Sequence, residues 1–211
     1  MGNPFWGDPH ASWIFHPAYL IEFSVDGRPK LCISISVMYP YPGLHVSECH
    51  RLIVVDTQKQ FLNSNTESVV SGIDAMMPHF QRVVASQIEL DPNSMFFRLK
   101  KWAPAKVGST GHELAIKTDG LLQNQFHVTR KSFISAYTED AATFLAAKPG
   151  ETIHICGMDT DMCVLQTGID VMRAGMRPVI LKDLCMSFAG SSMHEHAVIQ
   201  CKRFFGRDQV L

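Results

Sequence analysis

The sequence lacks an excess of basic residues and a long apolar run. Its 19 Lys and Arg face 20 Asp and Glu among 211 residues, for a formal net charge of -1, so there is no basic field to hold a phosphate backbone. No apolar run approaches the roughly 18 residues of a membrane span, and the first residues lack the basic and apolar regions of a signal peptide. We therefore expect a cytoplasmic protein that binds neither nucleic acid nor membranes.

Two further absences bear on cysteine and nucleotide chemistry. The six cysteines include no Cys-x-x-Cys pair, and a chain of this length can bury a core without disulfide staples, so we expect free thiols. Neither Gly-x-Gly-x-x-Gly nor a Walker A loop occurs. The common nucleotide-binding motifs therefore have no support in this sequence.

Two patterns divide the chain into parts. Residues 19–25 and 30–37 flank an Asp-Gly pair, and the second run alternates apolar residues with serine, which predicts a β-hairpin. A break rich in proline and tyrosine follows, and the pattern then changes. We expect residues 1–48 to form an extension that carries the hairpin, and residues 49–211 to form the main domain.

In the main domain, short apolar runs alternate with helical patterns. The runs predict strands at 52–55, 83–85, 126–128, 152–155 and 179–181. Apolar spacings of three and four predict helices at about 66–77, 138–147, 161–174 and 192–204. Residues 103–124 fit neither pattern and predict a long loop. This alternation is typical of a three-layer α/β domain, with a mainly parallel sheet flanked by helices.

Three chemically capable residues fall at the ends of predicted strands, where such sheets bind ligands. Asp56 and Lys131 follow apolar runs, and Cys163 falls at the start of a helix. The first turn of a helix favours an anion, which predicts a lowered pKa for the Cys163 thiol. Asp56 could accept the thiol proton beside the cation of Lys131. The same spacing is explained if Asp56 is a solvated turn residue, Lys131 a surface charge and Cys163 a helix filler, so both interpretations stay open.

Longer segments around these residues narrow the choice. Residues 52–61 are Leu-Ile-Val-Val-Asp-Thr-Gln-Lys-Gln-Phe, residues 131–137 are Lys-Ser-Phe-Ile-Ser-Ala-Tyr, and residues 157–165 are Gly-Met-Asp-Thr-Asp-Met-Cys-Val-Leu. Together, in this order, they resemble the isochorismatase-like cysteine hydrolases, which include nicotinamidases, carbamoylsarcosine amidases and ureidoacrylate amidases. The resemblance covers roughly residues 51–211.

The resemblance implies a fold and a catalytic centre. It implies an isochorismatase-like α/β fold with a catalytic triad of Asp56, Lys131 and Cys163. It also implies a cis peptide bond just before Asp159. We assign the oxyanion hole to the backbone N–H groups of Asp159 and Cys163.

Other residues are candidates for the surroundings of this centre. Phe61 and Tyr137 match family positions near the substrate pocket, with ordinary core aromatics as the alternative, and Trp102 is a further pocket candidate. Gln58 and Thr160 are candidates for hydrogen bonds that support the centre, although polar turn residues are common.

Two departures from family patterns bear on the substrate. The nicotinamidase branch carries a metal site in an Asp-x-His pattern after its second strand, whereas residues 86–94 contain no histidine. His194 and His196 are two apart on a predicted helix and point to different sides, so we expect no metal and no other cofactor. Isochorismate-cleaving members lack the nucleophilic cysteine, so Cys163 favours an amide, ureido or carbamoyl substrate.

The sequence thus predicts a hydrolase that cleaves a C–N bond of a small molecule through an acyl-thioester on Cys163. Two alternatives stay open: hydrolysis of an isochorismate-like ether, and a catalytically silent member that binds a metabolite or a protein. Ammonia release distinguishes amide hydrolysis from the first alternative. Thiol reactivity distinguishes an active enzyme from the second. Because oligomers are usual in the family, we expect a homo-oligomer.

Overall fold

The computed structural model describes residues 20–23, 29–32, 51–89, 91–101 and 105–211. The chain divides into two units, Met1–Ser47 and Glu48–Leu211. In the first unit, β1 (Leu20–Phe23) pairs antiparallel with β2 (Pro29–Cys32). β1 lies within the first of the two runs that predict the hairpin, and β2 begins one residue before the second run. The turn lies outside the described residues. The assignment of two domains remains a prediction.

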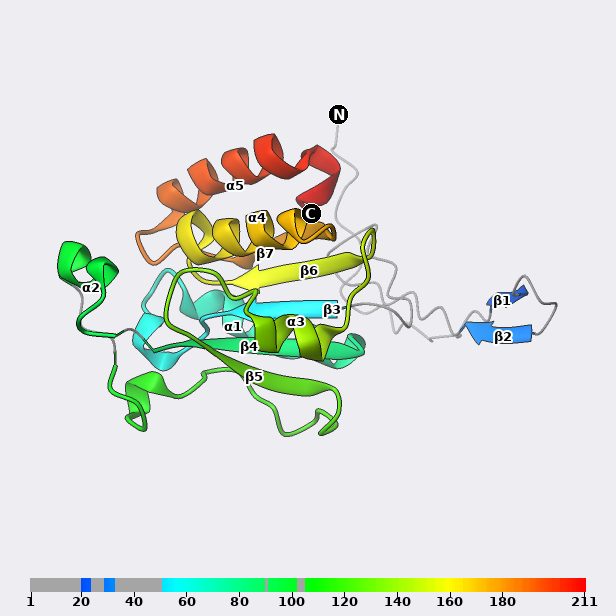
Figure 1. Ribbon diagram of the computed structural model, residues 1–211, viewed down its shortest axis with the longest axis horizontal. Helices are drawn as coiled ribbons and strands as arrows, with labels where there is room; N and C mark the ends of the chain where they lie inside the picture. Colours follow the sequence, from blue (N-terminus) through cyan, green and yellow to red (C-terminus); the bar gives the residue numbers. More distant parts are fainter. Residues whose placement is uncertain (1–19, 24–28, 33–50, 90, 102–104) are drawn as a thin grey trace, which may run out of the picture. The chain divides into compact units, whose positions relative to one another are not determined.

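The second unit alternates strands with helices along the chain (Figure 1). Its main elements are β3 (Arg51–Val55), α1 (Glu67–Met76), β4 (Arg82–Ile88), α2 (Met95–Lys100), β5 (Phe126–Lys131), α3 (Glu139–Leu145), β6 (Thr152–Gly157), α4 (Leu165–Arg173), β7 (Arg177–Cys185) and α5 (Ser191–Phe205). Short helical turns are η1 (Lys59–Phe61), η2 (Met77–His79), η3 (Thr110–His112), η4 (Thr160–Val164) and η5 (Arg207–Gln209). Each of the five strand runs of the main domain is confirmed.

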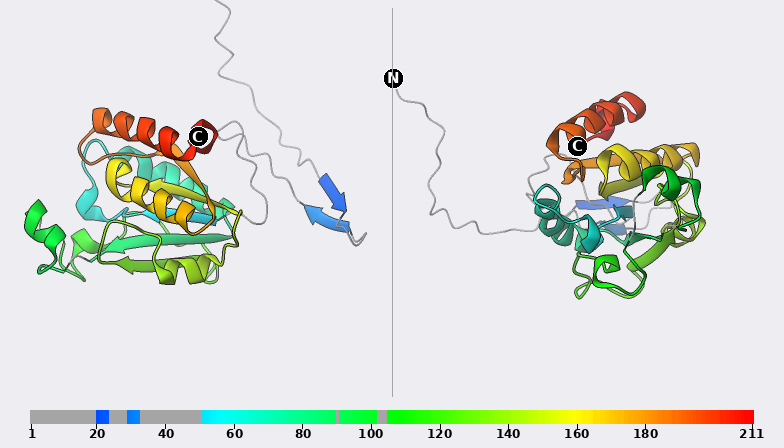
Figure 2. Two further views of the ribbon diagram at one scale, coloured as in Figure 1. Left: turned by 45° about the horizontal axis from the view of Figure 1, so that its top comes forward. Right: turned by 90° about the vertical axis from the view of Figure 1, so that its left-hand side faces the viewer.

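Five parallel strands form the central sheet in the order β5-β4-β3-β6-β7. Figures 1 and 2 show α3 and α4 on one face of this sheet and α1 on the other. Helix α5 packs against α4 and β7. The predicted three-layer α/β fold is therefore confirmed.

The apolar runs correspond to strands that are covered on both faces. Four successive residues of β3, Leu52, Ile53, Val54 and Val55, are fully buried. A strand between two helical layers has no polar face, which explains why β3 reads as a continuous run. The edge strand β5 instead carries an exposed residue, Arg130.

The order of the strands creates a crevice at one end of the sheet. From β3 the chain moves outward to β4 and β5, and it then returns to the other side of β3 to form β6 and β7. The segments that follow β3 and β6 therefore diverge at the carboxyl ends of neighbouring strands. Such a switch point is where open α/β sheets bind ligands.

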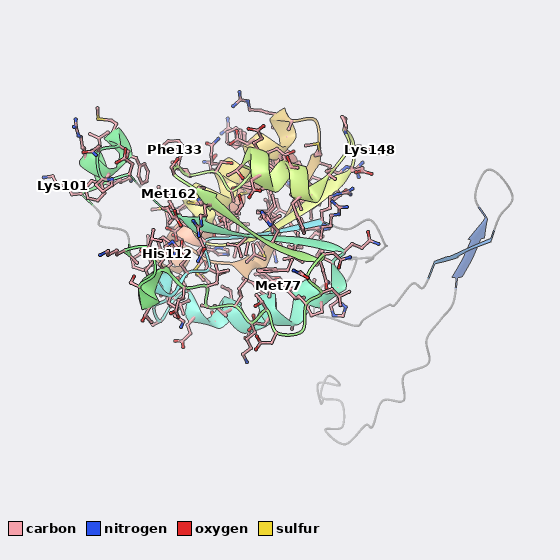
Figure 3. The ribbon with its side chains drawn as sticks, turned by 60° about the horizontal axis from the view of Figure 1, so that its bottom comes forward. Met77, Lys101, His112, Phe133, Lys148 and Met162 are labelled. Atoms are coloured by element: carbon pink, nitrogen blue, oxygen red, sulfur yellow. The ribbon has the colours of Figure 1, made fainter. Side chains whose placement is uncertain are left out.

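Helix α2 is an element that the sequence did not predict. Its first turn is capped by Ser94 Oγ, which accepts a hydrogen bond from Phe97 N at 3.2 Å, and it ends at Lys101 in the left-handed region. Phe96 packs edge-on against Phe133, with ring centroids 5.7 Å apart. In Figure 3, Phe133 and Met162 lie on the side of the sheet that faces α2. A helix of six residues is too short to produce a clear period.

The start of the third predicted helix differs from expectation. The segment predicted as one helix over 161–174 begins with η4, a wider π-helical turn, and continues as α4. The predicted loop at 103–124 contains the short turn η3 among its described residues. None of the described helices combines the length and the apolar character that crossing a membrane requires.

We predict that replacing Gly157 with alanine destabilises the domain strongly. Gly157 has φ +109°, and an added Cβ would overlap Val55 O and lie 2.7 Å from Val55 N. The expected loss of unfolding free energy is about 3 kcal/mol or more, from backbone strain and overlap together. Urea denaturation measures it. Gly150→Ala is the matched control, because Gly150 has φ +86° with no atom near the added Cβ, and about 1–2 kcal/mol is expected there. Equal losses in the two variants would contradict the close packing of β3 against β6.

Candidate active site

Asp56 follows β3 directly and is buried, with 2% exposure. Its backbone lies in the left-handed region at φ 48°, which Asp tolerates better than most residues. Ser86 on β4 holds it twice: Ser86 Oγ donates to Asp56 Oδ1 at 2.7 Å and accepts from Asp56 N at 3.0 Å. One carboxylate oxygen is thus fixed, and Oδ2 is directed toward Lys131.

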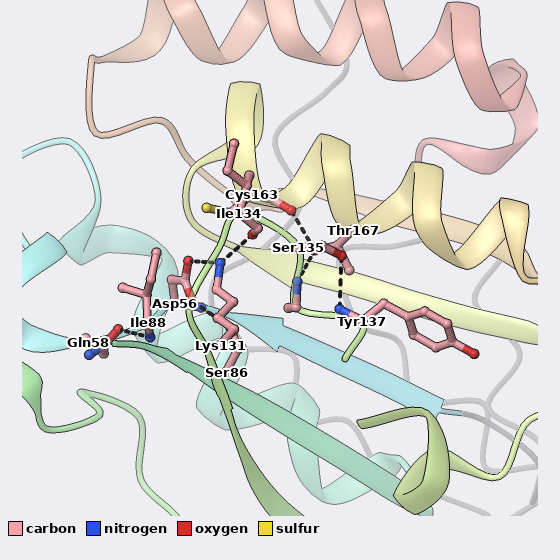
Figure 4. Close-up of polar contacts among 11 residues, drawn as sticks. Asp56, Gln58, Ser86, Ile88, Lys131, Ile134, Ser135, Tyr137, Cys163 and Thr167 are labelled. Carbon is pink, nitrogen blue, oxygen red and sulfur yellow. Dashed lines mark hydrogen bonds and ion pairs between the residues drawn. The ribbon is translucent and has the colours of Figure 1, made fainter. Parts of the chain in front are cut away.

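Lys131 is the last residue of β5, and its side chain reaches over β4 to Asp56 (Figure 4). Its Nζ lies 2.6 Å from Asp56 Oδ2, and both side chains are almost fully buried. The ammonium also donates a hydrogen bond to Ile134 O. Burial alone would lower the pKa of Lys131, but the charge of Asp56, assisted by Cys163, raises it above its ordinary value. Lys131 therefore carries its positive charge.

Cys163 lies in η4, immediately before α4. Thr167 Oγ1 donates to Cys163 O at 2.6 Å and accepts from Ala136 N at 2.8 Å. Thr167 thereby fastens the turn of Cys163 to the segment that follows Lys131. Charge and hydrogen bonding from Asp56 and from Lys131 both act on the pKa of the Cys163 thiol, so the structure brings the three predicted triad residues together.

The predicted direction of the thiol pKa is wrong. Burial raises the pKa of Cys163, and the charge of Asp56 raises it further, while Lys131 opposes them. The end of a helix contributes only about 0.3–1 kcal/mol at an exposed site, which these larger effects exceed. One ammonium faces two potential anions, and the raised pKa means that the thiol keeps its proton. Ionising the thiol therefore requires a proton acceptor, and Asp56 is adjacent.

The segment between β6 and η4 leads from the sheet to the turn that holds Cys163. The Met158–Asp159 peptide bond is cis. Met158 N donates to Val55 O at 2.8 Å and Thr160 N donates to Met186 O at 3.3 Å. Within the described part of the chain, the N–H of Asp159 between them has no acceptor. Assignment of the oxyanion hole to the N–H groups of Asp159 and Cys163 remains a prediction.

A pocket of about 210 Å³ opens beside Cys163. Its lining residues are mostly apolar and comprise Gln60, Phe61, Ile88, Phe96, Lys100, Asp159, Met162, Cys163 and Phe188. Phe61 is therefore in the pocket wall. Tyr137 is not among the described residues that line the pocket, and its ring extends away from Cys163 (Figure 4). Trp102, the third aromatic candidate, lies outside the described residues.

Gln58 and Thr160 both form supporting hydrogen bonds. Gln58 is fully buried, accepts from Ile88 N at 2.8 Å and donates to His112 O at 3.2 Å. Thr160 Oγ1 lies 2.9 Å from His194 Nδ1 on α5. These contacts connect the segments after β3 and β6 to neighbouring elements.

Sequence reasoning missed two supporting residues and most of the pocket wall. Ser86 could have been found, because it directly follows the predicted strand at 83–85. In the structure, Ala85 of this strand pairs with Val54 in the neighbouring strand. Thr167 carries no such signal, because its role depends on where the segment after β5 crosses α4. The same holds for Phe96 and Phe188, which come from segments far apart in the chain.

Comparison with known proteins agrees with this geometry. The Isochorismatase domain model matches residues 50–207. The chain belongs to the isochorismatase family. No curated protein matches the chain.

Solved structures with the same fold include three from different organisms. A nicotinamidase from Bacillus subtilis has a TM-score of 0.62 and 24% identity, covering 76% of this chain and 98% of its own. An isochorismatase-like hydrolase from Alkaliphilus metalliredigens has a TM-score of 0.62 and 19% identity, covering 76% and 93%. A pyrazinamidase of Pyrococcus horikoshii in complex with zinc has a TM-score of 0.60 and 19% identity, covering 76% and 96%.

The residues of this isochorismatase-family chain do not fit the metal of the nicotinamidase branch. Glu89, in the corresponding stretch, has Oε1 3.3 Å from His112 Nε2 and 3.3 Å from Arg130 Nε. The guanidinium beside Glu89 would repel a cation, and a metal site needs more donors than these two. No group of three or more His, Cys, Asp or Glu suited to a metal exists among the described residues.

We predict that Lys131→Met lowers the unfolding free energy by about 3–5 kcal/mol, because it leaves the Asp56 carboxylate buried without a counter-charge. The double variant Asp56→Asn/Lys131→Met should lose about 2 kcal/mol less, since no lone charge remains. Urea denaturation of both variants checks this. Lys59→Met is the control, because Lys59 pairs with Glu113 at 2.6 Å on the surface and should lose less than about 1 kcal/mol. A double variant less stable than Lys131→Met would contradict the role of the ion pair.

Proposed function

We propose that this protein is a hydrolase that cleaves a C–N bond of a small amide, ureido or carbamoyl compound, with Cys163 as nucleophile. The observation that supports it is the meeting of a thiol, a buried carboxylate and a buried ammonium beside a pocket. A thiol with a base and a cation in reach is the arrangement required for nucleophilic catalysis.

The first half of the reaction transfers the acyl group to sulfur. Asp56 accepts the thiol proton as Cys163 Sγ attacks the substrate carbonyl carbon. Lys131 balances whichever of the two groups is negative at that moment. The backbone N–H groups of Asp159 and Cys163 bind the tetrahedral oxyanion. As the C–N bond breaks, Asp56 returns its proton to the leaving nitrogen, and ammonia or an amine departs.

The second half releases the acid. Water replaces the departed amine, and Asp56 takes one of its protons while the oxygen attacks the thioester carbonyl. Collapse of the second tetrahedral species breaks the C–S bond, and the proton on Asp56 passes to sulfur. The thiol and the carboxylate are then restored, and every step uses residues of this chain.

Two features support a small substrate and a metal-independent reaction. The pocket of about 210 Å³ is smaller than the roughly 300–1,000 Å³ of sites for drug-sized ligands. The donor set around Glu89 does not suit a metal. The names of the similar solved structures include nicotinamidase and pyrazinamidase, which favours an amide over an ether as substrate.

We expect Cys163→Ala to reduce ammonia release to background, a loss of at least about 10³-fold, because Cys163 is the one cysteine among the described residues that lines the pocket and could form the acyl intermediate. The measurement is ammonia release from a panel of small amides, ureido compounds and carbamoyl compounds. Cys156→Ala is the matched control, since Cys156 is a free thiol buried within β6 and does not line the pocket. That variant should retain its activity, and a chelator should have no effect on either protein.

Two results would count against the proposal. Normal ammonia release by Cys163→Ala would refute the nucleophile assignment. Release of an acid without ammonia or an amine would indicate cleavage of an ether. Alkylation of the free thiol no longer separates an active from a silent protein, because its raised pKa predicts slow alkylation in both.

A further inference from the structure

In addition to the backbone N–H that we assign to the oxyanion hole, Asp159 has a carboxylate side chain. It lines the pocket together with Cys163 and Phe188. Its Oδ1 accepts a hydrogen bond from Phe188 N at 2.6 Å. The other oxygen, Oδ2, accepts no hydrogen bond from the described residues and is not buried. One carboxylate oxygen is thus held in place, and the second is open to a ligand.

A carboxylate at this position is unfavourable for the chemistry unless something neutralises it. Burial raises the pKa of Asp159 to about 6, with smaller contributions in the same direction from Asp161 and Asp56, while Phe188 N–H and Lys131 lower it. The group is therefore ionised at neutral pH. An anion beside the predicted oxyanion hole would repel the tetrahedral oxyanion. A positive charge on the substrate would remove that repulsion.

The rest of the pocket wall also suits a cation. Three phenylalanines, Phe61, Phe96 and Phe188, line it, and aromatic faces attract cations. Asp159 is the one carboxylate among the described residues of the lining. Lys100 also lines the pocket and opposes a cation, but it is an exposed residue of α2, so water and salt screen its charge.

We propose that Asp159 is a specificity-determining residue, which selects substrates that carry an ammonium or another cationic N–H donor within a few bonds of the scissile carbonyl. The cationic group and the scissile carbonyl must be close together, because the N–H and the carboxylate that bind them belong to one residue, Asp159. This inference rests on the proposed hydrolase function. It names the class of substrate that the same site accepts.

The test uses two thiol reagents of similar size and fixed, opposite charge: 2-(trimethylammonio)ethyl and 2-sulfonatoethyl methanethiosulfonate. The modification rate of Cys163 is followed by mass spectrometry of its peptide in the full-length protein. Asp159→Asn should lower the ratio of cationic to anionic rates about tenfold, as loss of a unit charge at short range predicts. A change in the thiol pKa alters both rates equally and cancels in the ratio.

Asp161→Asn is the matched control. Asp161 lies in the same turn, but its Oδ1 accepts from Ser187 Oγ at 2.5 Å and it does not line the pocket. In Asp161→Asn the ratio of cationic to anionic modification rates should change less than about twofold. In Asp159→Asn the amide oxygen still accepts from Phe188 N, so the turn should be retained, and equal urea midpoints for wild type and variant verify this.

The ratio should also depend on pH in the wild type. Between about pH 7.5 and about pH 5 it should fall toward the value of Asp159→Asn, because the carboxyl gains a proton below its raised pKa. His194 faces the same turn through Thr160, and burial lowers its pKa. Any contribution of His194 to the pH dependence of the ratio is also present in Asp159→Asn. Subtracting the pH dependence of that variant from that of the wild type therefore removes it.

A pair of substrates of equal shape extends the test to catalytic turnover. Aminoacetamide and propanamide differ by an ammonium in place of a methyl group. The wild type should prefer aminoacetamide in kcat/KM, and Asp159→Asn should reduce this preference about tenfold. An unchanged rate ratio in Asp159→Asn, or an equal loss in Asp161→Asn, overturns the inference. A shifted ratio without ammonia from any amide supports the role of Asp159 in binding cations and overturns the hydrolase proposal instead.

Discussion

The ion pair between Lys131 and Asp56 organises the end of the sheet where the pocket lies. Its two atoms are 2.6 Å apart, and neither side chain has appreciable contact with water. A buried charge without its partner is strongly destabilising, so β5 and β3 must keep their places on either side of β4. Ser86, on the strand between them, binds the same carboxylate. The geometry of the site is therefore tied to the register of three neighbouring strands.

The turn that holds Cys163 is attached to this pair from the other side of the switch point. Thr167 connects the Cys163 carbonyl to the segment after Lys131, and Val55 O holds Met158 N. Thiol, carboxylate and ammonium therefore share one positive charge in a small volume. This shared charge explains why the resting thiol is protonated. Burial, with the nearby charges of Asp161 and Asp56, also raises the pKa of Asp159.

Much of the fold follows from local patterns. The inner strands were predictable because they are buried, and a parallel strand covered on both faces is apolar along its length. Asp56, Lys131 and Cys163 were predictable as a group because the carboxyl ends of such strands meet at one edge, and because three motifs occur in the family order. Helix α2 could not be predicted, since six residues carry little periodicity. Tyr137 is not among the described residues that line the pocket, because its motif position says nothing of the direction of its ring.

The sequence by itself determined the alternation of strands and helices, the family, and which residues have the chemistry for a nucleophile, a base and a cation. Only the tertiary structure decided how they act on one another. A thiol at the start of a helix predicts a lowered pKa, but burial and a neighbouring carboxylate reverse the direction. Such effects depend on distance and on exclusion of water, and both arise when residues over 100 positions apart in the chain come together, as Asp56 and Cys163 do.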